Sequence, residues 1–378
     1  MMKGSVLFVL GKFGIGGVER VTITVANELL RRGWRVSVVA FEFLDPSLRK
    51  NLDRSIAVEE LSFPAFRFSN VLRLRKFMQK QNVTSIINQW ALPFPLTLML
   101  LAARPKGAKL IAFHHNIPNL NNRIAAAGGG LRIWFWRKLS AINLSLVYRF
   151  NDVYGVLSAS FKEVFSNFTG VKDAGKIWAI PNPIKVKPPL GIPKENVIIY
   201  VGRLDRFQKR VDRVIEIWKR LHKQLPEWRL EIVGDGEDRE ALESLARDVP
   251  RVEFFGFQDP GSFYERAQLL VLTSDFEGFG MVLVEAMSYG CVPVAFGSFA
   301  AIHDVIQEEN GVIVPMPWDA ERFANSVLRL AEDQDRIEKM AVEARKSVKK
   351  FSLQCVGDQY ESMLTGPAES VVMKDVKP

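Results

Sequence analysis

The fold of this chain is decided by residues 269–295, which read LLVLTSDFEGFGMVLVEAMSYGCVPVA. Leu269–Thr273 and Val292–Ala295 are short, continuous apolar runs of the kind that form buried strands. Val282–Tyr289, between them, is expected to form a helix. A strand, a helix and a strand in this order predict parallel strands with the helix on one face of the sheet. Ligands of such sheets bind at the carboxyl ends of the strands, so the loop after the first strand is expected to face a ligand.

The same alternation of apolar runs and amphipathic stretches continues on both sides of this unit. It is interrupted once, by Pro181-Asn-Pro183 and the proline-rich residues 185–193, a composition typical of a hinge. We therefore predict an α/β protein of two doubly wound, Rossmann-like domains, residues 1–183 and 184–352, which face an interdomain cleft. Residues 353–378 are expected to form a C-terminal helix that packs back on the N-terminal domain, followed by a loose tail.

The composition of the 378 residues, 48% apolar and 25% charged, is that of an ordinary globular protein. The two cysteines have neither metal-ligand spacing nor the number that a disulfide framework needs, so we expect free thiols. The first apolar run, Ser5–Leu10, is too short for a signal peptide. The most apolar stretch, Ala91–Ala103, contains two prolines and is shorter than the roughly 20 residues that span a membrane. A cytoplasmic protein without a transmembrane segment is expected.

Positive charge is concentrated in the first half of the chain. Residues 1–183 hold 25 Lys or Arg and 10 Asp or Glu, whereas residues 184–378 hold 26 and 32. No Asp or Glu lies between Glu60 and Asp152, a segment that holds 13 Lys or Arg. A region this basic is expected to attract an anionic surface or ligand.

A glycine-rich turn, Gly14-Ile-Gly-Gly17-Val-Glu19, lies between the first predicted strand and the first predicted helix. Glycines let a ligand approach the backbone closely, and the start of a helix offers N–H groups to an anion. A tight turn without a ligand explains the same glycines equally well. The spacing matches neither a Walker loop nor the dinucleotide-binding fingerprint.

Basic side chains follow the first strand of the second predicted domain, in the run VGRLDRFQKRVD at residues 201–212. Arg203 and Lys209 are suited to hold a diphosphate, Arg as a planar fork and Lys as a point charge. A solvated basic loop is the alternative interpretation. The position between a strand and a helix favours a binding site.

Two glutamates lie within residues 269–295. Glu277 lies in a loop with Gly278, Phe279 and Gly280, whose backbone N–H groups are expected to face a ligand. Glu285 follows within the helix, among apolar neighbours, where a charge is unusual without a partner. A carboxylate accepts paired hydrogen bonds from the vicinal hydroxyls of a ribose or a hexose. Either glutamate alone is also explained as an exposed charge.

Two of the four histidines stand together in His114-His115-Asn116, just after the predicted strand Lys109–Phe113. Ligand groups gather at such strand ends. A structural histidine is the alternative, and a zinc site is not expected because no Cys or carboxylate lies at ligand spacing.

These four motifs, in this order, resemble glycosyltransferase family 4, the retaining transferases of the GT-B fold, and the resemblance covers nearly the whole chain. Its most specific element is the pair of glutamates Glu277 and Glu285, separated by seven residues. The other elements are Gly202-Arg203-Leu204 with Lys209, Gly16-Gly17-Val18-Glu19, Ile232-Val-Gly-Asp-Gly236 and His115-Asn116.

The resemblance implies a role for each motif. Arg203 and Lys209 would hold the donor diphosphate, Glu277 a hydroxyl of the donor sugar, and His115 would approach that sugar from the acceptor side. The remaining donor-binding residues would be Glu285 at the ribose, Phe257 beside the base, the backbone of Phe279, Gly280 and Met281 at the sugar and phosphate, and Gly16 and Gly17 at the diphosphate.

The chain departs from the family pattern after Arg203. The family places its lysine five positions on and follows it with glycine, whereas Lys209 lies six positions on and is followed by Arg210. Arg206 and Arg210 are therefore alternatives to Lys209. For the histidine, His115 is preferred to His114 because Asn116 adjoins it.

The family also implies a mechanism without a metal or another cofactor. No Asp-x-Asp stands where a metal-dependent transferase would hold its ion, and no second carboxylate is an obvious nucleophile. Positive charge would stabilise the leaving diphosphate, and the leaving phosphate would take the acceptor proton.

The acceptor side is expected in the basic N-terminal domain. Arg73, Arg75 and Lys76 lie on one predicted helix, and residues 131–138 read LRIWFWRK. In the latter, Trp134, Trp136, Arg137 and Lys138 give the composition of a helix that lies in a membrane interface. A core helix with a solvated basic edge is the alternative.

We predict a retaining hexosyltransferase that uses a nucleotide sugar, with UDP as the default nucleotide. Its acceptor would be a glycan, lipid-linked in the synthesis of cell-surface polysaccharide or lipopolysaccharide, and the enzyme would lie peripherally on the inner face of the cell membrane. The alternatives are a nucleotide-sugar epimerase of the same fold, a non-catalytic nucleotide-sugar-binding protein and a nucleic-acid-binding protein. The last is disfavoured because no nucleic-acid-binding module is recognised.

Overall fold

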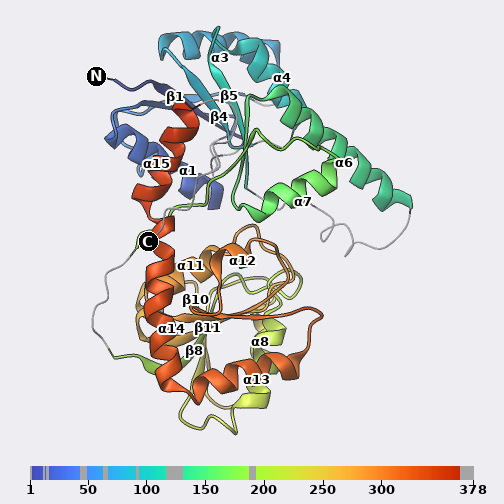
Figure 1. The fold of residues 1–378 in the computed structure, drawn as a ribbon, viewed down its shortest axis with the longest axis vertical. Coiled ribbons are helices and arrows are strands. Elements are labelled where there is room, and N and C mark those ends of the chain that lie inside the picture. Colours follow the sequence, from blue (N-terminus) through green and yellow to red (C-terminus); the bar gives the residue numbers. More distant parts are fainter. Residues whose placement is uncertain are drawn as a thin grey trace. The chain divides into compact units, whose positions relative to one another are not determined.

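The structure is a computed structural model. It describes residues 2–11, 13, 17–42, 49–62, 67–90, 93–115, 131–186 and 193–366, without the side chains of 131–133. The chain forms two compact units (Figure 1), Met1–Pro183 together with Leu353–Pro378, and Ile184–Ser352.

The first unit is built on a parallel sheet of seven strands in the order β3-β2-β1-β4-β5-β6-β7. The central strands carry Val, Ile, Leu and Phe and are buried along their whole length, as expected for parallel strands covered by helices on both faces. The strands are β1 (Ser5–Leu10), β2 (Arg35–Ala40), β3 (Ala57–Glu60), β4 (Ser85–Asn88), β5 (Lys109–His114), β6 (Val153–Val156) and β7 (Ile177–Ala179).

The helices of the first unit include one from the far end of the chain. Helix α15 lies beside α1 (Figure 1), although more than 300 residues separate them in the sequence. The helices are α1 (Gly17–Arg31), α3 (Phe68–Lys80), α4 (Phe94–Ala103), α6 (Leu131–Phe150), α7 (Ser160–Thr169) and α15 (Leu353–Thr365).

Ion pairs fasten α15 to the first unit. Arg32 Nη1 donates to Asp358 Oδ1 at 2.5 Å and to Glu361 Oε2 at 3.0 Å. Lys3 Nζ and Trp34 Nε1 both donate to Glu361 Oε1, at 2.6 and 2.8 Å. Burial opposes the charge on Glu361, but these hydrogen bonds outweigh it and lower the pKa of this carboxyl to about 2. The Glu361 carboxylate that holds the C-terminal helix therefore stays ionised at neutral pH.

The second unit is built on a parallel sheet of six strands in the order β10-β9-β8-β11-β12-β13. The strands are β8 (Glu195–Val201), β9 (Arg229–Val233), β10 (Val252–Gly256), β11 (Ala267–Leu272), β12 (Val292–Phe296) and β13 (Val312–Val314). The helices are α8 (Val211–Leu221), α9 (Arg239–Ala246), α10 (Gly261–Arg266), α11 (Met281–Ser288), α12 (Ile302–Val305), α13 (Ala320–Ala331), α14 (Gln334–Ser347) and the 3₁₀ helix η1 (Val348–Phe351).

The strand order of the second sheet reverses between β8 and β11. From β8 the chain moves outward to β9 and β10, and it then returns to β11 on the other side of β8. The loops that follow β8 and β11 therefore start next to each other at the carboxyl edge of the sheet, the usual position of a ligand in folds of this kind. This topology sets the loop that carries Arg203 and Lys209 beside the loop that carries Glu277.

The predicted fold class, an α/β protein with two doubly wound, Rossmann-like parallel sheets, is confirmed. The strand expected at Leu269–Thr273 is β11, which begins at Ala267, and the helix expected at Val282–Tyr289 is α11. In the described part of the chain, no helix is long and apolar enough to cross a membrane.

Candidate functional site

Arg203 follows β8 and Gly202, and its guanidinium is hydrogen-bonded to side chains of the same loop. Its Nε and Nη2 donate to Asp205 Oδ2 at 3.0 and 2.5 Å, and Nη2 also donates to Gln208 Oε1 at 3.1 Å. The side chain is nevertheless 58% exposed. Arg203 thus presents an oriented positive charge to solvent at the carboxyl edge of the sheet.

Asp205 organises the loop between Arg203 and Lys209. Its buried carboxylate accepts the backbone N–H groups of Phe207 and Gln208 through Oδ1, at 2.8 and 2.6 Å. Burial acts to raise the pKa of Asp205, but these hydrogen bonds and those from Arg203 lower it overall. The sequence interpretation missed Asp205, although an Asp that accepts N–H groups two and three positions on is a recognisable local turn.

Lys209 and Glu277 are in direct contact. Lys209 Nζ donates to Glu277 Oε1 at 2.6 Å, and Ser274 Oγ donates to the same oxygen at 2.7 Å. The side chains of Lys209 and Glu277 are only 19% and 8% exposed. Two residues 68 positions apart, both predicted from the sequence as site residues, therefore form one partly buried ion pair.

Further hydrogen bonds join the β8 loop to the β11 loop. Asp275 N donates to the carbonyl oxygen of Gln208 at 2.9 Å, and Gln208 Nε2 donates to the carbonyl oxygen of Phe276 at 3.1 Å. Thr273 Oγ1 donates to the carbonyl oxygens of Lys209 and Arg210, at 3.2 and 2.9 Å. The two loops are thus one hydrogen-bonded body, and a ligand bound to one is held relative to the other.

The contacts of Lys209 differ from those of Arg206 and Arg210, the two alternatives to it in the sequence. Arg206 donates to Asp238 Oδ1 at 3.0 Å, and Arg210 pairs with Asp212 and Asp275. Of these three basic residues, Lys209 is the one whose side chain pairs with Glu277.

Glycines bring the loops after β8 and β9 into close contact. A Cβ on Gly234 would lie 1.8 Å from the carbonyl oxygen of Gly202, and one on Gly236 would lie 2.3 Å from that of Leu204. Gly202 N donates to Val233 O, and Leu204 N donates to Asp235 O. The glycines of the run Ile232–Gly236 therefore let the arginine-bearing loop lie directly against the β9 loop.

Helix α11 begins at Met281, directly after the Glu277 loop. Gly280 has a left-handed backbone with φ 77°, and Phe279 is buried with its ring 5.5 Å from that of Phe351. The first N–H groups of a helix have no acceptor within the helix, and the positive end of the helix dipole lies there. Both features favour the binding of an anion. The loop thus carries both a carboxylate and a helix start.

Glu285 is half-buried, one turn further along α11. Burial raises the pKa of Tyr264 well above its ordinary value, and the charge on Glu285 raises it further. Glu285 therefore faces α10, the helix that follows β10. Phe257, the residue directly after β10, is 79% exposed.

The two histidines at the end of β5 differ in environment. His114 is 2% exposed, with Nδ1 2.7 Å from the Tyr154 hydroxyl, and burial lowers its pKa to about 4. His115 is partly exposed, and its Nε2 contacts Gln89 Oε1. Burial, together with His114, lowers the pKa of His115 to about 3. Both imidazoles are therefore neutral at pH 7. Asn116, on which the choice of His115 was based, lies outside the described residues.

The glycine-rich turn is described only in part. Gly16 lies outside the described residues, and Gly17 is the first residue of α1. Within the described part of the chain, a Cβ on Gly17 would meet no atom within 4 Å, so packing against those residues does not require glycine here. Burial raises the pKa of Glu19 in the same turn.

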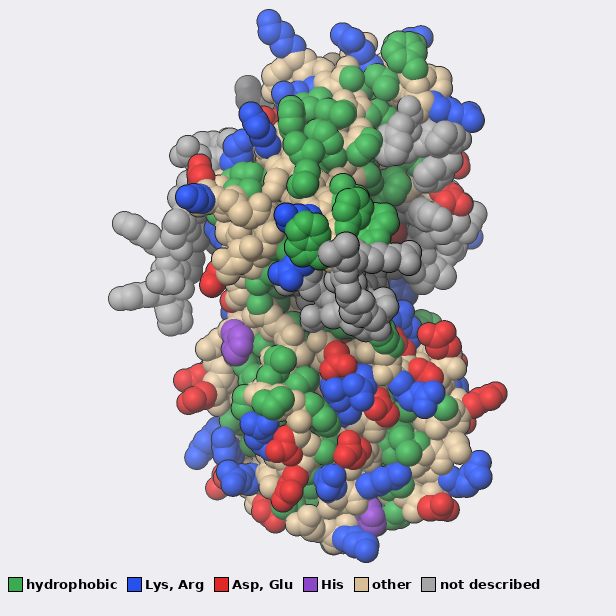
Figure 2. All heavy atoms as spheres, turned by 90° about the vertical axis from the view of Figure 1, so that its right-hand side faces the viewer, with side chains coloured by type: hydrophobic (Ala, Val, Ile, Leu, Met, Phe, Trp, Pro, Cys, Tyr) green, Lys and Arg blue, Asp and Glu red, His purple; other side chains and the backbone are tan. Residues whose placement is uncertain are grey.

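The basic and aromatic residues of the first unit lie on its surface. On α3, Arg73 pairs with Glu59 at 2.8 Å, whereas Arg75 and Lys76 are exposed. Among the described side chains of α6, the exposed large apolar ones are Trp134 (53%), Phe135 (58%), Trp136 (50%), Leu139 (45%), Ile142 (55%) and Phe150 (42%). Arg137 and Lys138 are exposed among them, and Lys138 Nζ lies 4.1 Å from the centre of the Trp134 ring. Figure 2 shows hydrophobic and basic side chains together on this side of the first unit.

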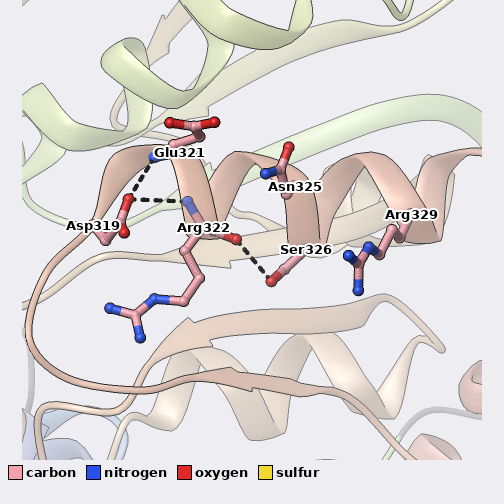
Figure 3. A pocket seen from close by; sticks show the side chains of 6 residues that line it. All are labelled: Asp319, Glu321, Arg322, Asn325, Ser326 and Arg329. Atoms are coloured by element: carbon pink, nitrogen blue, oxygen red, sulfur yellow. Dashed lines mark hydrogen bonds between the residues drawn. The ribbon is translucent and has the colours of Figure 1, made fainter.

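A separate polar groove of about 280 Å³ runs along α13 (Figure 3). Asp319 caps this helix by accepting the N–H groups of Glu321 and Arg322, both at 3.0 Å. The groove contains none of the predicted site residues, and its lining consists of Asp319, Glu321, Arg322, Asn325, Ser326 and Arg329.

Comparison with known proteins covers both units. The family "Glycosyltransferase Family 4" matches residues 15–187, and "Glycosyl transferases group 1" matches residues 184–347. One relative, 23% identical over 96% of this chain and 98% of its own, is a Campylobacter jejuni enzyme named GalNAc-alpha-(1->4)-GalNAc-alpha-(1->3)-diNAcBac-PP-undecaprenol alpha-1,4-N-acetyl-D-galactosaminyltransferase.

Two solved structures share the fold. The lipopolysaccharide outer core galactosyltransferase WaaB, in its apo form, superposes with a TM-score of 0.70 at 21% identity, over 95% of this chain and 98% of WaaB. Anabaena HepE, in complex with UDP and glucose, superposes with a TM-score of 0.75 at 20% identity, over 96% of this chain and 99% of HepE.

Proposed function

Because the chain belongs to glycosyltransferase family 4, we propose that it transfers a hexose from a nucleoside diphosphate sugar to a glycan, with retention at the anomeric carbon. The observation that carries this proposal is the Lys209–Glu277 pair, at the carboxyl edge where the order of the second sheet reverses. A cation for the phosphates and a carboxylate for the sugar stand side by side there, as the transfer of a sugar from a diphosphate requires.

The diphosphate is bound by Arg203 and Lys209. Arg203 offers a planar guanidinium that is already oriented by Asp205, and Lys209 offers an ammonium fixed on Glu277. As the bond between the anomeric carbon and the phosphate oxygen breaks, negative charge grows on that oxygen. Cations held in place by the protein stabilise this charge without having to reorganise. The start of α11 adds its N–H groups on the same side.

The sugar and the nucleoside are held by the two glutamates. Glu277 accepts from a sugar hydroxyl, and Ser274 keeps its carboxylate oriented at 2.7 Å. Glu285 accepts from the ribose hydroxyls, with Phe257 beside the base. UDP is the nucleotide we propose, and the UDP bound in HepE, which has this fold, supports that choice.

The acceptor proton goes to the leaving phosphate. Burial and the neighbouring His114 lower the pKa of His115, which makes this imidazole a weak base for that proton. A neutral His115 instead donates or accepts one hydrogen bond and thereby orients the sugar on the acceptor side.

Calorimetric titration of the ligand-free protein with UDP, GDP and ADP tests the donor site. We expect saturable binding of at least one diphosphate, and that binding should weaken strongly in Arg203→Ala. The absence of binding for all three would refute the proposal. An epimerase is distinguished by NMR, because it would convert the nucleotide sugar without any acceptor. A retaining transferase would instead hydrolyse the sugar slowly and release it first with the donor's own anomeric configuration.

The acceptor we propose is lipid-linked and reached from an anionic membrane surface on the inner face of the cell membrane. The support is the first turns of α6, where residues 134–138, three aromatic side chains followed by Arg137 and Lys138, are all exposed. Aromatic rings of this kind insert into the headgroup region of a membrane. Each basic residue near an anionic lipid surface contributes about 1 kcal/mol to the free energy of binding. Helix α3 also combines exposed apolar and basic side chains, since Phe68 and Leu72 are exposed and Arg75 and Lys76 follow them. The C. jejuni relative is named for an undecaprenol-linked acceptor.

Vesicle flotation tests the membrane contact. We expect the protein to bind vesicles that contain phosphatidylglycerol and to bind phosphatidylcholine vesicles weakly. A variant with Trp134, Trp136, Arg137 and Lys138 all changed to Ala should lose most of this binding. The matched control changes exposed Lys219 and Leu245 of the second unit to Ala and should bind as the wild type does. Undiminished binding of the fourfold variant would refute the contact.

A further inference from the structure

Arg210 occupies a backbone conformation that normally requires glycine. It stands directly before α8 with φ 52° and ψ 50°, in the left-handed region. A side chain with a Cβ is disfavoured in this region, whereas glycine adopts it freely. The family pattern has a glycine after its lysine, and this chain has Arg210 there instead. Arg210 therefore adopts a left-handed turn in this chain without being a glycine.

The Arg210 side chain bridges the β8 loop and the β11 loop. Its Nη2 and Nε donate to the two oxygens of Asp212 at 2.9 and 3.2 Å, and its Nη1 donates to Asp275 Oδ2 at 3.1 Å. Asp212 lies on α8, whereas Asp275 lies two residues before Glu277. One guanidinium thus connects the start of α8 to the loop of the glutamate.

Asp275 is a fixed anchor for this bridge. Its other oxygen, Oδ1, accepts from Arg213 Nη1 at 2.5 Å, and Nη1 also donates to the carbonyl oxygen of Thr273 at 3.1 Å. Arg213 is 7% exposed, and its guanidinium lies 4.4 Å from the centre of the Trp318 ring. The carboxylate that holds Arg210 is therefore itself held by a buried arginine.

We infer that Arg210 is a positioning residue: it maintains the left-handed turn that directs the preceding Lys209 at Glu277 and at the donor diphosphate. This inference rests on the proposed function. The ion pairs with Asp212 and Asp275 stabilise the turn that glycine would adopt without help. The turn sets the direction of the chain at Lys209, whose Nζ then reaches Glu277 at 2.6 Å.

The inference predicts an unusual order among variants. Arg210→Ala keeps the unfavourable Cβ and loses the ion pairs, so Lys209 is no longer directed at the diphosphate. Arg210→Gly also loses the ion pairs, but it adopts the turn freely. The glycine variant should therefore behave like the wild type, although it is the larger truncation. Arg220→Ala, which removes an exposed arginine of α8 that pairs with Glu216, is the matched control.

The experiment is calorimetric titration with UDP and with uridine, because uridine lacks the groups that Lys209 binds. We expect Arg210→Ala to lower the affinity for UDP about five- to tenfold and to change the affinity for uridine by less than about twofold. Arg210→Gly and Arg220→Ala should bind both ligands with affinities within about twofold of the wild type. A merely structural role would weaken both ligands together.

Three results would each overturn the inference. The first is an unchanged UDP affinity in Arg210→Ala, and the second is an equal loss of affinity for UDP and for uridine in that variant. The third is an Arg210→Gly variant that binds UDP as weakly as Arg210→Ala does. If the wild type prefers GDP or ADP to UDP, that diphosphate and its nucleoside replace the two probes. If the wild type binds none of the three diphosphates, the proposed function fails and the inference fails with it. That outcome is distinct from a wild type and an Arg210→Ala variant that bind equally well.

Discussion

Replacing Lys209 by Met should destabilise the Ile184–Ser352 unit, because it leaves the Glu277 carboxylate buried without its cation. The two groups are 2.6 Å apart, and the Glu277 side chain is only 8% exposed. Methionine keeps the length and the apolar stem of lysine, so the loss of packing is small. The variant therefore isolates the electrostatic effect of the missing ammonium.

The size of the effect follows from the burial of the pair. Removing one partner of a buried ion pair costs about 3–5 kcal/mol. Ser274 still donates to the carboxylate at 2.7 Å, and Lys209 is 19% exposed, so the lower end, about 3 kcal/mol, is expected. For a unit of this size about 1 kcal/mol corresponds to roughly 2–4 °C, which predicts a fall in Tm of roughly 6–12 °C.

Differential scanning calorimetry of the ligand-free protein measures this fall, read on the transition of the Ile184–Ser352 unit. The double variant Lys209→Met with Glu277→Gln should recover more than half of the loss, because the buried group is then uncharged. Lys219→Met, at an exposed position of α8, is the control and should leave Tm unchanged. A Lys209→Met variant within about 2 °C of the wild type, or a double variant as unstable as the single one, would refute the reasoning.

Two further predictions concern the glutamates and the histidines. Glu285→Gln should lower the affinity for UDP and for uridine alike, by roughly tenfold in calorimetry, whereas Glu277→Gln should mainly lower kcat. If both variants lowered the affinity for UDP equally, the roles of the two glutamates would be misassigned. The pKa values of His114 and His115, about 4 and about 3, lie below the ordinary value of 6.5, so the unfolded chain takes up protons that the folded unit does not. The first unit should therefore lose stability as pH falls from 6.5 toward 4, and His114→Gln should reduce that dependence by roughly half. Exposed His303→Gln is the control in thermal scans over this pH range, and an equal reduction in both variants would contradict the assignment.

Much of the candidate site was predicted from the sequence because its elements are local. Apolar runs and their spacing identify strands and helices, and the ends of parallel strands mark where ligands bind. Arg203, Lys209 and Glu277 were placed at strand ends on this basis, and the structure has them there. The contact between Lys209 and Glu277 had no local signal, because it depends on β8 and β11 being neighbours in the sheet.

The residues that support the site were missed for the same reason. Asp275 and Arg213 lie in different elements, and their roles follow from contacts across more than 60 positions of the sequence. Neither residue belongs to a motif that would single it out. Asp205 is the exception, since its hydrogen bonds are to the next few residues and give a local pattern.

The sequence by itself determined the two parallel sheets, the uneven charge and the candidate residues, because hydrophobic periodicity and composition are properties of neighbouring residues. The tertiary structure was needed to show which of three cations pairs with Glu277, that His114 contacts Tyr154 inside the unit while His115 is partly exposed, and that Arg210 has a left-handed backbone. These outcomes depend on which strands lie side by side and on which carboxylates their loops bring within reach. That information is carried by packing between distant segments, and no short stretch of the chain contains it.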